Sequence, residues 1–217
     1  MTPAVSPQRA REIAGRFGAC RVLIVGDVMV DHFVVGRVNR ISPEAPVPVV
    51  EFDHESVRLG GAANVAHNVR AFGAHVELVG VVGDDDPART LRAELAALGL
   101  SADGLVVAGD RPTTRKMRIV TTRNQQVARV DFETDADSGE GLSAELAERA
   151  LARLATADVV LVSDYLKGVV TARLMAAITA AAAAHGLPVL VDPKIPHLLH
   201  YRGASLITPN HHEAETA

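Results

Sequence analysis

Beyond residue 60 the chain alternates helix-forming segments with short apolar segments, and this alternation restricts the fold more than any other feature of the sequence. Helical patterns occupy residues 61–73, 86–98, 142–156 and 169–185. Five short apolar segments predict buried strands at 77–83, 104–108, 158–164, 187–193 and 204–210. Strands and helices that alternate in this way form an α/β fold, a doubly wound and mainly parallel sheet with helices on both faces.

An earlier apolar run, residues 21–27, predicts the first strand of the same sheet, because it is apolar throughout and ends at Gly and Asp. In a sheet of this kind, ligands bind beyond the carboxyl ends of the strands. Those ends carry Asp27, Asp164, Asp192 and Asn210. We therefore expect the functional site along this edge.

Four further segments are β-branched or alternating, and they are not each followed by a helix. They are 29–38, 47–57, 115–123 and 125–133. They predict a small, mostly antiparallel sheet beside the main one, with its strands within about 29–57 and 112–133. No linker divides the chain, so residues 1–217 are predicted to form one domain.

Composition excludes several classes of protein. The net charge of −4 provides no basic field for nucleic acid. Cys20 is the only cysteine, which excludes an internal disulfide framework and favours a reducing compartment, the cytoplasm by default. No apolar run reaches the roughly 18 residues of a membrane span, and the first twenty residues lack the apolar region of a signal peptide.

The most specific motif is Gly60-Gly61-Ala-Ala-Asn64-Val-Ala, with Gly73 and Gly83 further on. Two glycines before a helix let backbone N–H groups approach a ligand, and an Asn in the first turn can donate to sugar hydroxyls. A glycine pair alone is usually only a turn before a helix. The complete spacing resembles the first signature of the ribokinase-like (PfkB) carbohydrate kinases.

Asp31 lies where the main sheet passes into the small one. A carboxylate here can accept paired hydrogen bonds from vicinal hydroxyls. The resemblance implies that Asp31, Gly60, Gly61 and Asn64 bind the sugar. The alternative is an Asp that caps a turn or faces solvent, and Asp27 is a weaker candidate for the same role.

The stretch from Thr208 to Glu213 has two interpretations. Asn210 and Glu213 have the spacing of a capping box, in which each side chain bonds the other residue's backbone. The resemblance implies that this Asn-x-x-Glu, with His211 and His212 between, orders Mg²⁺-bound water around the phosphates of ATP. Adjacent histidines on a helix point in different directions, so no direct metal ligand is predicted.

A substrate that carries a phosphate group needs lysine or arginine. Lys116 and Arg118 lie in the predicted small sheet, and Asp192 and Lys194 follow a strand of the main sheet. We expect these four residues to contribute to the substrate site. For any one basic residue, a plain role on an exposed sheet face is the alternative, and Lys167 is a further candidate.

Longer stretches resemble one subfamily, the D-glycero-β-D-manno-heptose-7-phosphate kinases. They are residues 40–50, 121–126, 163–168, 191–194 and 201–204. The resemblance implies a transfer from ATP, with Mg²⁺, to the anomeric hydroxyl of a heptose 7-phosphate on the way to ADP-heptose. It also implies that the small sheet is a lid and an interface in a homodimer.

One departure from the family bears on activity. The second signature of these kinases, a Gly-Ala-Gly-Asp loop with the catalytic base, does not occur here. We therefore expect that the C-terminal part of the domain is missing, that the base lies beyond residue 217 and that this chain alone is inactive. The alternatives are a non-catalytic fragment that binds sugar phosphate or dimerises, and a kinase of the same family with another sugar phosphate as substrate.

Overall fold

The main sheet of the computed structural model, which describes residues 5–216, has six parallel strands. Their order is β10-β9-β8-β1-β4-β5, and every neighbouring pair is parallel. The strands are β1 (Arg21–Gly26), β4 (His75–Val82), β5 (Leu105–Val107), β8 (Val159–Ser163), β9 (Val189–Asp192) and β10 (Leu206–Ile207). The doubly wound α/β fold predicted from the sequence is thereby confirmed.

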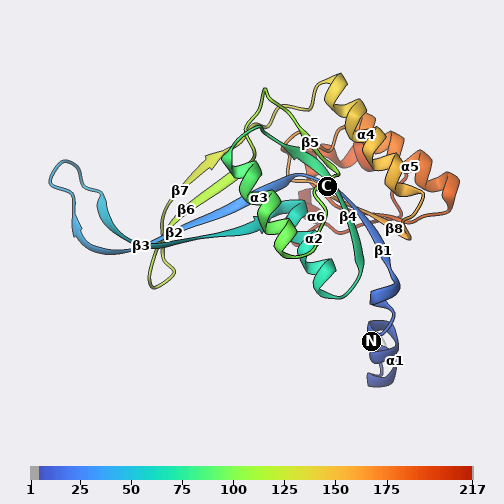
Figure 1. Ribbon diagram of the computed structural model, residues 1–217, viewed down its shortest axis with the longest axis horizontal. Coiled ribbons are helices and arrows are strands. Elements are labelled where there is room, and N and C mark those ends of the chain that lie inside the picture. Colours follow the sequence, from blue (N-terminus) through green and yellow to red (C-terminus); the bar gives the residue numbers. More distant parts are fainter. Residues whose placement is uncertain (1–4, 217) are drawn as a thin grey trace.

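Helices cover both faces of this sheet (Figure 1). One face packs against α2 (Gly61–Ala71) and α3 (Asp86–Ala97), and the other against α4 (Glu140–Leu154) and α5 (Ala172–His185). Successive β1 residues alternate between the two cores: Ile24 belongs to the α2–α3 side, and Val25 to the α4–α5 side. Both are fully buried, which explains why β1 is apolar throughout.

The strand order reverses beside β1. The chain runs outward from β1 to β4 and β5, and then returns to place β8 on the other side of β1. The carboxyl ends of β1 and β8 therefore adjoin at the switch point of the sheet, where ligands bind in this class of fold. Asp27 and Asp164 follow these two strands directly.

The small sheet has four strands in the order β3-β2-β6-β7. Its strands are β2 (Val28–Ile41), β3 (Pro48–Gly60), β6 (Arg115–Thr121) and β7 (Gln126–Phe132). Only the β2–β6 pair is parallel, so the expectation of a mostly antiparallel sheet is confirmed. Only Asp27 separates β1 from β2, and α2 begins directly after β3. Figure 1 shows the β2–β3 hairpin extending away from the main sheet.

Shorter elements complete the fold: α1 (Pro7–Ala14), η1 (Phe17–Ala19), η2 (Ile195–Tyr201) and α6 (His211–Thr216). The helix predicted at 169–185 begins three residues later than expected, because the Thr171 side chain accepts a hydrogen bond from the Leu174 N–H and caps it. Among the helices of residues 5–216, none combines the length and the apolar character that crossing a membrane requires.

Candidate functional site

Asp31 and Gly60 come together at the base of the small sheet. Asp31 lies on β2, between Arg58 of β3 and Lys116 of β6 in the strand register. A Cβ atom added at Gly60 would lie 2.8 Å from Oδ2 of Asp31, so only glycine leaves room for this carboxylate. The other oxygen, Oδ1, accepts a hydrogen bond from the Arg118 guanidinium. The Asp31 side chain keeps 24% of its surface exposed, which leaves it accessible to a ligand.

The two glycines turn the chain from β3 into α2. Gly61 has a left-handed φ of 55°, and the Ala62 N–H donates to the Asp27 carbonyl oxygen at 2.9 Å. Asn64 is exposed one turn into α2, about 6 Å along the helix axis from Gly60. Its side-chain amide makes no hydrogen bond within residues 5–216. The predicted sugar ligands Asp31, Gly60, Gly61 and Asn64 thus lie in one region.

Asp27, the weaker candidate, has a structural role. Its buried carboxylate accepts hydrogen bonds from three backbone N–H groups of the loop after β8: Tyr165 at 2.7 Å, Lys167 at 3.2 Å and Val169 at 3.1 Å. Burial raises the pKa of Asp27, and the nearby Asp164 raises it further. Asp27 thereby fixes the loop 165–169 against the end of β1.

Asp164 is fully buried and holds η2 against the sheet. Its Oδ2 accepts hydrogen bonds from the Tyr201 hydroxyl at 2.6 Å and from Nδ1 of His197 at 2.7 Å. Burial and this carboxylate raise the pKa of the Tyr201 phenol. The stretch 201–204, which resembles the heptose-phosphate kinases, therefore begins with a residue that shapes the edge of the site.

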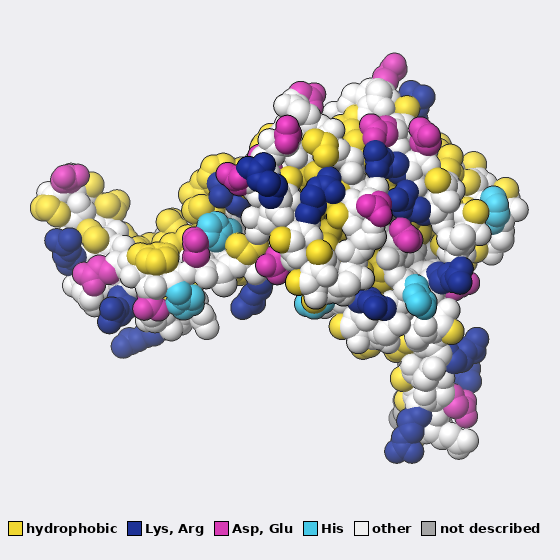
Figure 2. Space-filling view, in the orientation of Figure 1, with side chains coloured by type: hydrophobic (Ala, Val, Ile, Leu, Met, Phe, Trp, Pro, Cys, Tyr) yellow, Lys and Arg dark blue, Asp and Glu magenta, His cyan; other side chains and the backbone are white. Residues whose placement is uncertain are grey.

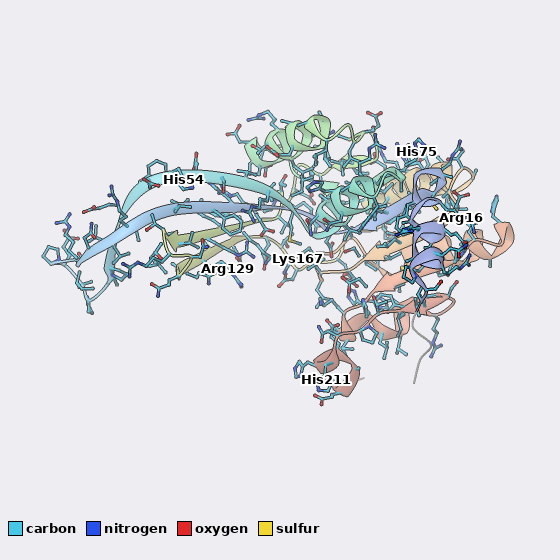
Figure 3. All side chains as sticks on the ribbon, turned by 90° about the horizontal axis from the view of Figure 1, so that it is seen from below. Arg16, His54, His75, Arg129, Lys167 and His211 are labelled. Atoms are coloured by element: carbon cyan, nitrogen blue, oxygen red, sulfur yellow. The ribbon has the colours of Figure 1, made fainter. Side chains whose placement is uncertain are left out.

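The predicted nucleotide residues only partly converge. Asn210 and Glu213 form the expected capping box, with both reciprocal hydrogen bonds at 2.9 Å. Oε1 of Glu213 also binds the Lys194 ammonium at 2.5 Å, which joins α6 to the end of β9. His211 and His212 are exposed, and Figure 3 shows His211 on α6 at the edge of the molecule. Among residues 5–216, no three His, Cys, Asp or Glu side chains form a group that could hold a metal ion.

Asp192, the last residue of β9, lies near the pair formed by Lys194 and Glu213. Burial raises the pKa of its carboxyl group, the charge of Lys194 opposes this effect, and the charges of Glu213 and Asp164 add to it. The Lys194 ammonium also lies 5.7 Å from the centre of the Tyr165 ring. Asp192 and Lys194 thus share one edge of the sheet with the loop that Asp27 fixes, as the sequence predicted for the strand ends.

Lys116 is engaged by carboxylates. Its ammonium lies 2.8 Å from Glu133 and 3.4 Å from Asp131. The second oxygen of Glu133 binds Lys167 at 2.9 Å, and Lys167 also binds Asp135 at 2.5 Å. Burial alone would raise the pKa of Glu133, but hydrogen bonds and charge from the two lysines outweigh burial and lower it. Glu133 therefore links the small sheet to the loop after β8, near Lys167 in Figure 3.

Two residues that the sequence did not single out lie next to Asp31. The guanidinium carbon of Arg58 is 5.2 Å from the centre of the Phe33 ring, and that of Arg118 is 5.5 Å from it. A cross-strand register would have identified Arg58, because it stands directly opposite Asp31. Phe33 follows Asp31 by two residues on β2 and so lies on the same face of the sheet.

Comparisons with known proteins identify the family of the chain. The model of the pfkB family carbohydrate kinases matches residues 20–217. The chain is 50% identical over 206 residues to a D-beta-D-heptose 7-phosphate kinase of Bordetella bronchiseptica, and this match covers 94% of this chain and 63% of that protein. It is 46% identical over 197 residues to the bifunctional protein HldE of Rhodopseudomonas palustris, and this match covers 90% of this chain and 40% of that protein.

A solved structure shares the fold. The ribokinase of Arabidopsis thaliana, complexed with ribose and ATP, matches with a TM-score of 0.61 at 15% identity. The match covers 89% of this chain and 61% of that one. The chain thus spans less than two thirds of the length of each of these three proteins.

Proposed function

Since the chain belongs to the pfkB family of carbohydrate kinases, we propose that it forms the sugar-binding part of a kinase for D-glycero-β-D-manno-heptose 7-phosphate. The proposed reaction transfers a phosphoryl group from ATP to the anomeric hydroxyl and gives the 1,7-bisphosphate. The identity of 50% to a heptose 7-phosphate kinase supports this substrate. We also propose the cytoplasm as its compartment, because the reaction consumes ATP and the chain has a single cysteine.

The observation that carries the proposal is the contact of Asp31 with Gly60 at the base of the small sheet, with Asn64 exposed one turn further along α2. A carboxylate accepts hydrogen bonds from two neighbouring hydroxyls, and an amide both donates and accepts. Arg118 is bonded to one oxygen of Asp31 and so orients its carboxylate. Oδ2, which lies against Gly60, can then accept from the sugar.

The nucleotide end of the site is proposed at Asn210 and Glu213, next to Lys194 of the predicted substrate site. Mg²⁺ would neutralise charge on the phosphates during transfer. Both oxygens of Glu213 are already bonded, one to Lys194 and one to the Asn210 N–H. Glu213 and Asn210 would therefore hold Mg²⁺ through water, as this strongly hydrated cation allows.

Binding tests the proposal directly, because it does not depend on turnover. We expect heptose 7-phosphate to raise the melting temperature of the chain and to bind in isothermal titration calorimetry. Asp31→Ala and Asn64→Ala should each weaken binding by about 5-fold to 150-fold, the equivalent of about 1–3 kcal/mol for a buried hydrogen bond. Binding that is unchanged in both variants refutes the site.

Asn39→Ala is the matched control for Asn64→Ala. Asn39 lies on the outer part of β2, where its amide binds Glu51 at 3.1 Å, away from Gly60. The control should leave the affinity for heptose 7-phosphate unchanged. A parallel assay of sugar-dependent ADP formation distinguishes the non-catalytic alternative, because turnover by this chain alone would exclude it.

We further propose a second copy of this chain as a partner, in contact through the small sheet. Large apolar side chains are exposed along its hairpin: Ile41 at 60%, Val47 at 51% and Phe52 at 64%. Figure 2 shows hydrophobic side chains gathered there, and apolar patches of this kind mark interaction sites. Light scattering after gel filtration should give a dimer mass that Phe52→Ser reduces. A monomeric wild type contradicts the proposal.

A further inference from the structure

We propose that Arg58 and Arg118, on either side of the Phe33 ring, bind the phosphate group of the acceptor sugar in a cavity on the small sheet. This inference rests on the proposed function, because it assigns one end of that substrate to named residues. The phosphate, a dianion with three terminal oxygens, would accept hydrogen bonds from both guanidinium groups.

The three side chains share one face of the small sheet. Phe33 is paired with Ser56 of β3 and with Arg118 of β6, and Arg58 stands one pair away, opposite Asp31. The two guanidinium carbons lie 5.2 Å and 5.5 Å from the centre of the Phe33 ring, within the range of cation–π contact. The ring thus holds both arginines beside one space.

That space is a cavity of about 560 Å³. Its lining includes both arginines and Phe33, together with hydroxyl, amide and imidazole groups from Ser56, Thr122, Asn124, Gln126 and His54. No carboxylate lines it. Figure 3 shows His54 on the β3 side of the sheet. A cavity with two guanidinium groups and only neutral acceptors around them suits an anion.

Arg58 differs from two neighbouring basic residues of this sheet, Lys116 and Arg129, because no carboxylate in the described part of the chain neutralises its charge. Lys116 binds Glu133 and Asp131, and Arg129 binds Asp131 at 3.0 Å. Within residues 5–216, Arg58 has no carboxylate partner, and its side chain is exposed. Arg118 uses Nη1 for Asp31, which leaves its other N–H groups for a second acceptor. Two guanidinium groups with N–H donors available to a further acceptor therefore flank Phe33.

The position also fits a sugar whose phosphate lies far from the reacting hydroxyl. Phe33 is two residues beyond Asp31 on β2, about 7 Å further from the main sheet. In a heptose, C6 and C7 extend outside the ring from C5, on the other side of the ring oxygen from the anomeric carbon. A heptose bound by Asp31 with its anomeric carbon toward the main sheet would direct this extension toward Phe33. Arg118 contacts both places, because it bonds Asp31 and lies over Phe33.

The experiment compares Arg58→Met with Arg129→Met, using heptose 7-phosphate and unphosphorylated heptose as ligands in calorimetry. Arg129 is the matched control: it lies on the neighbouring strand β7, in register with Arg118, and its charge is bound to Asp131. We expect Arg58→Met to weaken binding of the phosphorylated sugar by about 10-fold to 100-fold and to leave the unphosphorylated sugar within about twofold. Arg129→Met should change neither affinity.

Two further measurements make the result decisive. Arg58→Lys should recover part of the affinity, because it restores the charge without the planar pair of donors, and inorganic phosphate should protect the wild type from thermal unfolding more than Arg58→Met. Equal losses for both sugars, or equal effects of the two Met variants, overturn the phosphate assignment while the proposed function stands. A wild type that binds neither sugar refutes the proposed function, and the phosphate assignment with it.

Discussion

Replacing Gly61 by Ala tests the packing at the start of α2, where the proposed sugar site is built. Gly61 has a φ of 55°, in the left-handed region, and a Cβ atom there would lie 2.2 Å from the Asp27 carbonyl oxygen and 2.8 Å from Met29. The same oxygen accepts the hydrogen bond of the Ala62 N–H. The added methyl group therefore conflicts with backbone that cannot rotate away.

The magnitude follows from three contributions to the free energy of unfolding. A non-glycine residue in the left-handed region costs about 1–2 kcal/mol. Forcing a methyl group into a packed site costs about 1–3 kcal/mol, and loss of the Ala62 hydrogen bond costs about 1 kcal/mol. We expect Gly61→Ala to destabilise the chain by about 3–6 kcal/mol, a large part of the stability of an ordinary domain.

Gly99→Ala is the control, because Gly99 ends α3 with a φ of 66° and has no heavy atom within 4 Å of an added Cβ. It should lose only the conformational contribution of about 1–2 kcal/mol. Urea unfolding measures both variants, and with a slope of about 2 kcal/mol/M the two midpoints should differ by about 1–2 M. Equal midpoints refute the argument from the Asp27 carbonyl oxygen.

The remaining predictions concern the effect on stability of replacing Glu133, Asp85 or Asn210. Because the pKa of Glu133 is lowered, its carboxylate stabilises the fold above its ordinary pKa of 4.5, and this contribution is lost as the pH falls through the lowered value. Below about pH 5, wild-type stability in urea should therefore fall more steeply than that of Glu133→Gln, and parallel curves contradict this. Asp85 caps α3 and also accepts hydrogen bonds from the backbone N–H and the hydroxyl of Thr113. Asp85→Ala should therefore cost about 2–4 kcal/mol in the same assay, and a cost below about 1 kcal/mol would contradict the role of this half-buried carboxylate as a triple acceptor. Asn210→Ala removes only the exposed N-cap of α6, so it should lower the free energy of unfolding by at most about 1 kcal/mol. A larger loss would contradict the assignment of Asn210 as an exposed cap.

Much of the fold could be predicted because its signals are local. The apolar run of β1 and the alternation of strands and helices placed Asp27 and Asp164 at one edge of the sheet. Their roles could not be predicted, because they depend on contacts far apart in the sequence. Asp27 binds N–H groups of residues 165–169, and Asp164 binds the hydroxyl of Tyr201.

Of the candidate site, some residues could be predicted from the sequence and others could not. Asp31 and Gly60 came from a family resemblance, and the structure brings them into contact. Arg58 was missed because its importance depends on its register opposite Asp31. The loop at 42–47 that joins β2 to β3 is too long to fix a register from sequence alone, and the pairing also contains two bulges.

The Asn-x-x-Glu stretch shows a third case. Its capping box could be predicted from spacing, because both hydrogen bonds are formed within four residues. The contact of Glu213 with Lys194 could not, because Lys194 belongs to the end of β9 and reaches α6 only in the folded chain.

The two short connections at the base of the small sheet determine how its β2–β3 hairpin can move relative to the main sheet. One residue, Asp27, joins β1 to β2, and no residue separates β3 from α2. Neither junction therefore contains a loop that would let these strands slide relative to the main sheet. A rotation at these two junctions would therefore move the whole hairpin. Because β3 is 13 residues long, a rotation of about 10° at its base would carry the far end through about 7 Å.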